Sequence, residues 1–211
     1  MRRTKYFFKI VFLTVIYILV TVVLKVLLDV DRLVYNSLSE QLTTIQIQRY
    51  LNLHDNYKWL EYIVYFVYTL LKTSIITSVL YIGIFFSKSV ITFKSIFNKV
   101  IQAEFIFLLV PVFKIIWFYF FQTFYKLEDI QNFFPLSAIN ITGYEGLEPW
   151  YLYPLQTLNL FEVAYIFYLG IQMAKLTKST PDEGLKMVVF SYVPALLLWV
   201  CTIMFLTLNY S

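Results

Sequence analysis

The sequence predicts an all-α, polytopic integral membrane protein with five transmembrane helices, a cytoplasmic N-terminus and a C-terminus on the far side. Of its 211 residues, 60% are hydrophobic and only 14% are charged, whereas a soluble domain of this size carries about a quarter charged residues. Five apolar segments are long enough to cross about 30 Å of hydrocarbon, which takes roughly 20 residues. The lysines and arginines also favour alternate loops, and this bias orients membrane proteins.

The five predicted spans form a single transmembrane helical domain over residues 1–211. They are the segments Tyr6–Leu28, Trp59–Phe86, Ile101–Tyr125, Leu155–Leu176 and Leu185–Leu208. The first span follows Arg2, Arg3 and Lys5, as the apolar region of a secretory signal would. That region is only about 7–15 residues long in a signal and precedes a small-residue cleavage site. We therefore interpret the first segment as a retained span.

The basic residues near the spans determine the predicted topology. With the N-terminus inside, most of them fall on the cytoplasmic side: Arg2, Arg3, Lys5, Lys88, Lys94, Lys99, Lys175, Lys178 and Lys186. The far side keeps only Arg32, Arg49, Lys58 and Lys126 close to spans. Because the Lys/Arg bias agrees from loop to loop, it predicts a C-terminus that leaves the membrane on the far side.

Both long loops lie on that far side. Residues 29–58 carry apolar side chains three or four apart, namely Val34, Leu38, Leu42 and Ile45, which predicts an amphipathic helix. Such a helix either lies on the membrane or the helix bundle, or binds a partner. Residues 126–154 mix proline and glycine with aromatic residues, which excludes a long helix. The cytoplasmic loops are too short for a catalytic or nucleotide-binding domain.

The last span begins with a local helix-start signal. Thr180 provides a hydroxyl at the N-cap, Pro181 occupies the first helical position, and Glu183 stands at the third. This is the pattern of a capping box, in which two side chains satisfy free backbone donors reciprocally. We therefore predict a structural role for these three residues.

Other residues predict the shapes and contacts of the spans. Pro111 and Pro194 fall within the third and fifth spans, and each removes a backbone donor and should kink its helix. Gly170 and Ala174 form a pair of small residues four apart on the fourth span, which allows another helix to approach closely.

Three charged residues fall deep inside the predicted spans. Lys72 and Lys114 lie near 20 Å along their spans, and Glu162 lies roughly 12 Å along its own, at about 1.5 Å per residue. An unpaired charge at such a depth costs several kcal/mol. We therefore predict that Glu162 pairs with Lys72 or Lys114 and that Gln122, Gln172 or hydroxyls satisfy the remaining groups.

This pairing leaves three interpretations open. The charges form a structural ion pair, a proton- or ion-linked transport site, or a contact with a charged span of a partner subunit. Three further charged residues, Lys25, Glu61 and Glu104, lie close to span ends. We expect their side chains to reach the interface.

No catalytic motif is visible in the sequence. His54 is the single histidine and Cys201 the single cysteine, so we predict neither a zinc site nor an internal disulfide. The five glycines are scattered and form no phosphate-binding loop. The sequence therefore predicts no catalytic residue, no enzyme activity, no metal site and no cofactor. We expect neither nucleic acid nor a soluble nucleotide as a partner.

The C-terminal part of the chain, residues 154–208, resembles the last two spans of the Yip family of five-span membrane proteins. The matching elements are Pro154, Leu158–Phe161, Gly170, Lys175–Thr177 and Lys178–Leu185. The chain departs from the family pattern in its long far-side loops and in Glu162. The resemblance implies a non-enzymatic adaptor that binds other membrane proteins, or that works in membrane trafficking in eukaryotes.

Together these patterns predict an accessory or scaffold subunit of a larger membrane protein complex, in contact with the lipid bilayer and other integral membrane proteins. The alternative is a subunit of a transporter or channel that uses Lys72, Lys114 and Glu162. Composition favours a multi-pass protein of the bacterial cytoplasmic (inner) membrane. The glycosylation patterns at Asn140 and Asn209 leave a eukaryotic lumenal side open.

Overall fold

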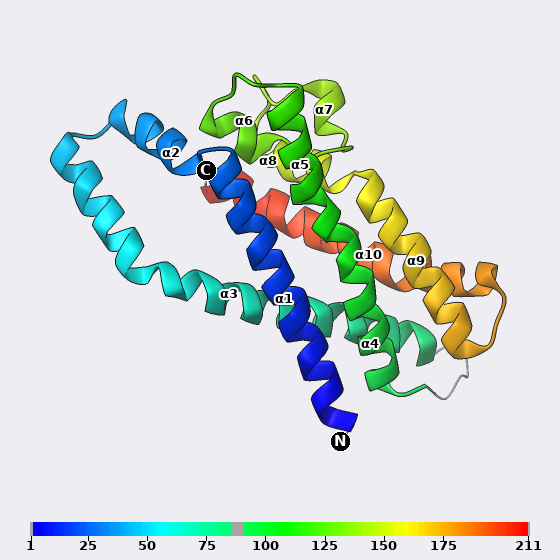
Figure 1. The fold of residues 1–211 in the computed structure, drawn as a ribbon. Helices are drawn as coiled ribbons and strands as arrows, with labels where there is room; N and C mark the ends of the chain where they lie inside the picture. Colours follow the sequence, from blue (N-terminus) through cyan, green and yellow to red (C-terminus); the bar gives the residue numbers. More distant parts are fainter. Residues whose placement is uncertain (1, 86–90, 211) are drawn as a thin grey trace. The chain divides into compact units, whose positions relative to one another are not determined.

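The computed structural model describes residues 2–85 and 91–210. For residues 2–6 it describes the backbone but not the side chains. Over these ranges the chain is helical, with one isolated β-bridge between Ser137 and Asn159 (Figure 1). The helices are α1 (Arg2–Leu27), α2 (Val30–Ser39), α3 (Thr44–Phe85), α4 (Phe93–Glu104), η1 (Phe105–Leu108), α5 (Leu109–Phe120), α6 (Leu127–Asn132), α7 (Ile139–Thr142), α8 (Pro149–Thr157), α9 (Leu160–Thr177) and α10 (Pro181–Tyr210). Phe86, predicted to end the second span, and Lys88, predicted for a cytoplasmic loop, lie outside the described residues.

Four helical segments of the described chain are long and apolar enough to cross a membrane. They are Phe7–Leu27, Thr44–Phe85, Phe93–Phe120 and Pro181–Tyr210. The all-α class and the membrane character predicted from composition therefore agree with the structure. Each of the four overlaps one of the predicted spans.

The predicted fourth span, Leu155–Leu176, differs from the structure because it is not one helix. The chain forms α8 and α9 there and leaves the helical conformation at Leu158 and Asn159. The Asn159 side chain accepts a hydrogen bond from the Glu162 backbone N–H at 2.7 Å, and this N-cap starts α9 as a new helix. With 18 residues, α9 is about 27 Å long at 1.5 Å per residue.

The segment 29–58, predicted to lie on the far side, also differs from its prediction as one amphipathic helix. Helix α2 ends at Ser39 and α3 begins at Thr44, so the apolar pattern is shared between two helices. The break occurs where the Gln46 side chain accepts hydrogen bonds from the backbone N–H and the hydroxyl of Thr43, both at 2.9 Å. Ile45, expected on the apolar face, is 80% exposed. Local polar contacts thus outweigh the hydrophobic periodicity here.

The described chain divides into two compact units, where the sequence was interpreted as one helical domain. The first comprises Met1–Leu70 and Pro111–Asn132, and the second comprises Leu71–Val110 and Phe133–Ser211. The second unit contains a continuous apolar core contributed by α3, α4, α9 and α10. Its buried residues are Ile76, Leu80, Ile84, Ile96, Val100, Ala103, Tyr165, Leu169, Met173, Val188 and Tyr192.

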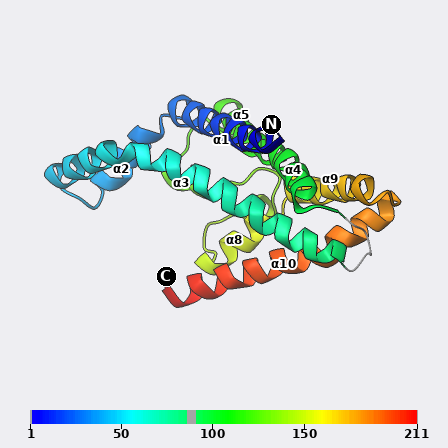
Figure 2. The same ribbon diagram turned by 90° about the horizontal axis from the view of Figure 1, so that it is seen from below.

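Helix α10 lies against two other helices of the second unit. Figure 1 shows α9 beside it, and Figure 2 shows α8 beside its C-terminal half. The Trp199 indole N–H donates to the Tyr153 hydroxyl at 2.8 Å and joins α10 to α8.

The α9–α10 contact depends on small residues. A Cβ atom added at Gly184 would lie 2.3 Å from the Gly170 carbonyl oxygen and 2.6 Å from the Ala174 nitrogen.

The two prolines predicted to kink helices have different surroundings. The short 3₁₀ helix η1 separates α4 from α5 just before Pro111. Pro111 has no N–H to donate to the Phe107 carbonyl and its ring crowds that carbonyl, so a tighter turn at this point has a direct physical cause. Helix α10 continues as an α-helix through Pro194, and a kink there stays a prediction.

The start of α10 contains both hydrogen bonds of a capping box. The Thr180 N–H donates to Glu183 Oε2 at 3.2 Å, and the Glu183 N–H donates to Thr180 Oγ1 at 3.4 Å. Replacing Thr180 by alanine should lower the free energy of unfolding by about 1 kcal/mol, because the Glu183 backbone N–H loses its hydrogen-bond acceptor. Unfolding by denaturant in a mild detergent measures this, with Thr202→Ala on exposed α10 surface as the control. Equal effects of both variants would contradict the capping role.

Candidate functional site: a buried charge cluster

Lys72, which is half-buried, and the buried Glu104 form an ion pair between α3 and α4. Lys72 Nζ lies 2.7 Å from Glu104 Oε2, and the Glu104 side chain is only 8% exposed. The ammonium also lies 4.2 Å from the centre of the Phe107 ring, a cation–π distance. The prediction that Glu104 reaches the interface is therefore wrong, because its carboxylate faces the protein interior and a lysine of another helix.

Tyr165 extends this pair to α9. Its hydroxyl donates to Glu104 Oε1 at 2.9 Å, so each carboxylate oxygen of Glu104 has a partner. The Tyr165 side chain is completely buried and its ring lies 5.0 Å from that of Phe107. Hydrogen bonds to a charged group are stronger than those between neutral groups. Tyr165 therefore stabilises the buried carboxylate and connects it to the core.

Glu162 has a partner other than the lysines predicted for it. Its Oε1 accepts a hydrogen bond from the Tyr192 hydroxyl of α10 at 2.6 Å. Because α9 starts after Asn159, Glu162 lies in the first turn of that helix. A carboxylate is favourable there, since the helix dipole and free N–H groups make this end positive. Lys114 contacts the Ile130 carbonyl instead, so its predicted pairing with Glu162 is wrong, whereas Lys72 forms its ion pair with Glu104 and acts on the Glu162 charge from a greater distance.

We call Lys72, Glu104, Glu162, Tyr165 and Tyr192 the charge cluster. The Tyr165 and Tyr192 rings lie 5.6 Å apart and connect its two halves. The cluster draws on α3, α4, α9 and α10, and its five residues all belong to the second unit. Its polar groups contact one another, so it can fix the register of four helices without a ligand. It also contains two carboxylates and one ammonium, a composition that could hold a proton.

Lys114, the other deep lysine, lies in the first unit and contacts backbone. Its Nζ donates to the Ile130 carbonyl oxygen of α6 at 2.6 Å. Ile130 is two residues from the end of α6, where carbonyl groups lack helical partners and attract positive charge. Lys114 therefore stabilises the C-terminal end of a short helix. The sequence had instead predicted an ion pair with Glu162.

The two glutamines named as further partners behave differently. Gln122 Oε1 accepts a hydrogen bond from the Trp117 indole N–H at 3.1 Å. Gln172 is 7% exposed, and its Oε1 accepts no hydrogen bond from residues 2–85 and 91–210. The Gln122 contact therefore does not involve the charge cluster.

A second ionic group, missed in the sequence, lies in the first unit. Glu61 Oε2 lies 3.1 Å from Lys25 Nζ, and Glu61 Oε1 lies 3.5 Å from His54 Nε2. His54 and Glu61 are seven residues apart on α3, which places them on one face two turns apart. That spacing was visible in the sequence, whereas the contact with Lys25 depends on how α1 packs on α3.

Removing the Tyr192 hydroxyl should isolate its contribution to the cluster. We expect Tyr192→Phe to lower the free energy of unfolding by about 1.5–3 kcal/mol, because the Glu162 carboxylate loses a charge-assisted hydrogen bond. Tyr168→Phe, also on a cluster-bearing helix, serves as the control. Denaturant titration in detergent measures both. A loss for Tyr192→Phe no greater than the control's would show that the bond contributes nothing.

Comparison of this chain with protein-family models, with curated proteins and with solved structures gives no match. The Yip resemblance therefore stays a prediction. Within residues 2–85 and 91–210, no group of three or more histidine, cysteine, aspartate or glutamate side chains is arranged to hold a metal ion. The geometry of the charge cluster is thus the main guide to function.

Proposed function

We propose that this chain is a non-enzymatic integral membrane protein that acts as an accessory or scaffold subunit of a larger membrane protein complex. The observation that supports this best is the mutual satisfaction of the charge cluster. Glu104 binds both Lys72 and Tyr165, and Glu162 binds Tyr192. Because these charged groups are used in contacts between helices, we infer that partners bind the outer surface of the protein and not the cluster.

The proposed topology has five spans, with α9 as the fourth, in the bacterial cytoplasmic membrane. The N-terminus is cytoplasmic and the C-terminus lies on the far side. If α9 does not cross, the C-terminus returns to the cytoplasm. Fusing a reporter after Ser211 distinguishes these two topologies. Alkaline phosphatase is active only outside the cytoplasm, whereas green fluorescent protein fluoresces only inside it. Phosphatase activity supports five spans, and fluorescence contradicts them.

Purification from the native host tests the scaffold role. The tagged chain is expressed at natural abundance, extracted in a mild detergent and analysed by mass spectrometry. We expect one or two integral membrane proteins to accompany it in a fixed ratio. Recovery of the chain alone, as a monomer or homo-oligomer, would contradict the proposal. An unrelated membrane protein of similar abundance and with the same tag provides the background.

The alternative is a subunit of a transporter or channel. The specific observation in its favour is that the charge cluster holds two carboxylates but one ammonium. With one more carboxylate than ammonium groups, one of the two carboxylates could gain and lose a proton during transport. Proteoliposomes that contain the purified chain and any co-purifying subunits test it. A proton flux that Glu162→Gln abolishes without loss of assembly would favour transport over a structural role.

A further inference from the structure

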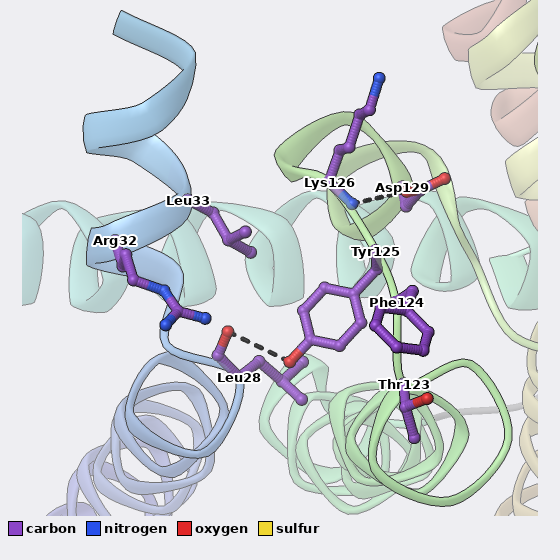
Figure 3. Close-up of a pocket in the computed structure, with 8 residues that line it drawn as sticks. All are labelled: Leu28, Arg32, Leu33, Thr123, Phe124, Tyr125, Lys126 and Asp129. Carbon is purple, nitrogen blue, oxygen red and sulfur yellow. Dashed lines mark hydrogen bonds between the residues drawn. The ribbon is translucent and has the colours of Figure 1, made fainter. Parts of the chain in front are cut away.

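A cavity of about 450 Å³ lies in the first unit, between the end of α1, helix α2 and the segment that joins α5 to α6. Figure 3 shows the side chains that line it. Two of them are basic, Arg32 and Lys126, and Leu33, Phe124 and Tyr125 provide apolar surface. The cavity therefore combines positive charge with aromatic and aliphatic walls, as a site for an amphiphilic anion would.

The two basic side chains keep donors for a ligand. Arg32 uses its Nε to pair with Asp29 Oδ2 at 3.0 Å, and a guanidinium has four further N–H donors on its terminal nitrogens. The Lys126 ammonium contacts no acceptor among residues 2–85 and 91–210. Asp129 is the one acid in the wall, and its Oδ2 accepts from the Lys126 backbone N–H at 2.6 Å.

The wall of the cavity is held in place by Tyr125. Its hydroxyl donates to the Leu28 carbonyl oxygen at 3.3 Å, and Figure 3 shows this bond across the cavity. The Tyr125 ring also lies 5.0 Å from the Phe118 ring of α5. These two contacts join the end of α1 to the segment after α5, and in Figure 3 the Lys126 side chain points away from Arg32.

The cavity also lies where a membrane interface is expected. Both α1 and α5 belong to segments apolar enough to span a membrane, and they end at Leu27 and Phe120, close to the cavity. Phe120, Phe121 and Phe124 are 70%, 71% and 92% exposed. Such large exposed rings are typical of the boundary between hydrocarbon and headgroups. We therefore expect one side of the cavity to border hydrocarbon and the other to border water.

We propose that this cavity binds the phosphate group of an anionic glycerophospholipid. The Arg32 guanidinium binds the phosphate oxygens, the Lys126 ammonium adds positive charge from the other wall, and the acyl chains follow the exposed surface at Phe124. Guanidinium groups match the geometry of phosphate oxygens, and an ammonium adds a point charge. A zwitterionic lipid carries a compensating positive charge, so the cavity should prefer a lipid with a net negative charge.

Native mass spectrometry of the full chain in a neutral detergent tests this proposal. The chain is titrated with dioleoyl phosphatidylglycerol or dioleoyl phosphatidylcholine, and the lipids bound per chain are counted. The wild type should prefer phosphatidylglycerol, and Arg32→Gln/Lys126→Gln should weaken that binding about twenty-five-fold, because each basic group contributes about fivefold. Lys126→Gln alone should weaken it about fivefold. Arg49→Gln, an exposed arginine of α3, should have no effect.

Three results would overturn the proposal. Equal binding of the two lipids by the wild type would show that charge is not recognised. Unchanged preference in Lys126→Gln, which breaks no side-chain contact of the described chain, would show that the cavity is not the site. Displacement of phosphatidylglycerol by millimolar inorganic phosphate would show that the basic groups take free phosphate instead. Circular dichroism of each variant establishes that it is folded.

Discussion

Replacing Lys72 by methionine should lower the free energy of unfolding by about 3–5 kcal/mol, a large effect for a single substitution. The variant removes the ammonium 2.7 Å from Glu104 and leaves a carboxylate that is 8% exposed. Tyr165 still donates to this carboxylate, but a neutral hydroxyl cannot balance its charge. Denaturant titration in detergent measures the loss. Lys94→Met, which removes an exposed lysine of α4, should change stability by less than about 0.5 kcal/mol.

A second substitution should restore most of this stability. In Lys72→Met/Glu104→Met both charges of the ion pair are gone, and two apolar side chains of similar length fill the space between α3 and α4. Replacing a buried ion pair by apolar residues is often neutral. Tyr165 then lacks an acceptor, so part of the loss, about 1–3 kcal/mol, should persist. A double variant less stable than Lys72→Met would contradict the interpretation of the pair as a packing element.

Gly184→Ala should also destabilise the protein strongly, although alanine is the better helix former. The helix propensity favours alanine by about 1 kcal/mol. Against this, the new Cβ would lie 2.3 Å from the Gly170 carbonyl oxygen and 2.6 Å from the Ala174 nitrogen. Both atoms belong to the α9 backbone, so they cannot turn aside as a flexible side chain would. We expect a net loss of about 2–3 kcal/mol, at the upper end of the overpacking range.

The control for this variant is Ala164→Val on the exposed surface of α9. It also enlarges a small residue of the α9–α10 pair, but at an exposed position where the larger side chain meets no other helix. Its effect on the free energy of unfolding should therefore stay within about 0.5 kcal/mol. Thermal unfolding followed by circular dichroism compares the two. A Gly184→Ala variant as stable as the wild type would mean that α9 and α10 separate at little cost.

Hydropathy and local patterns predicted much of the fold. The apolar runs in α1 and α10 are long, and length and hydropathy were enough to identify them. The capping box at Thr180 and Glu183 is a local contact, so its residue spacing contained the whole prediction. Gly170 and Ala174 predicted a close helix approach but not its partner, because the position of Gly184 depends on how α10 packs.

The break before α9 was missed although the sequence contained a signal for it. Asn159 and Glu162 stand three residues apart, the spacing of a helix N-terminus. A hydropathy window that begins at Leu155 averages over this signal. The error also changed the interpretation of Glu162, which lies in the first turn of α9 and not deep in a longer span.

The partner of Lys72 could not be read from the sequence. Glu104 is 32 residues away, and Tyr165 is a further 61 residues along the chain. Three helices must pack before these groups meet, and no local spacing encodes that contact. Depth along a span also misled the prediction, because Glu104 near a predicted span end was assigned to the interface. Its burial results from the apolar core around it.

The central claim is that the charge cluster holds the helices together while the protein acts by binding other membrane proteins. It is tested most directly by purifying Lys72→Met/Glu104→Met from the native host beside the wild type. Each protein is expressed at natural abundance, and partner ratios are quantified by mass spectrometry. Our account predicts partners in the same fixed ratio for both. A wild type that purifies without partners, or a folded double variant that loses them, would contradict it.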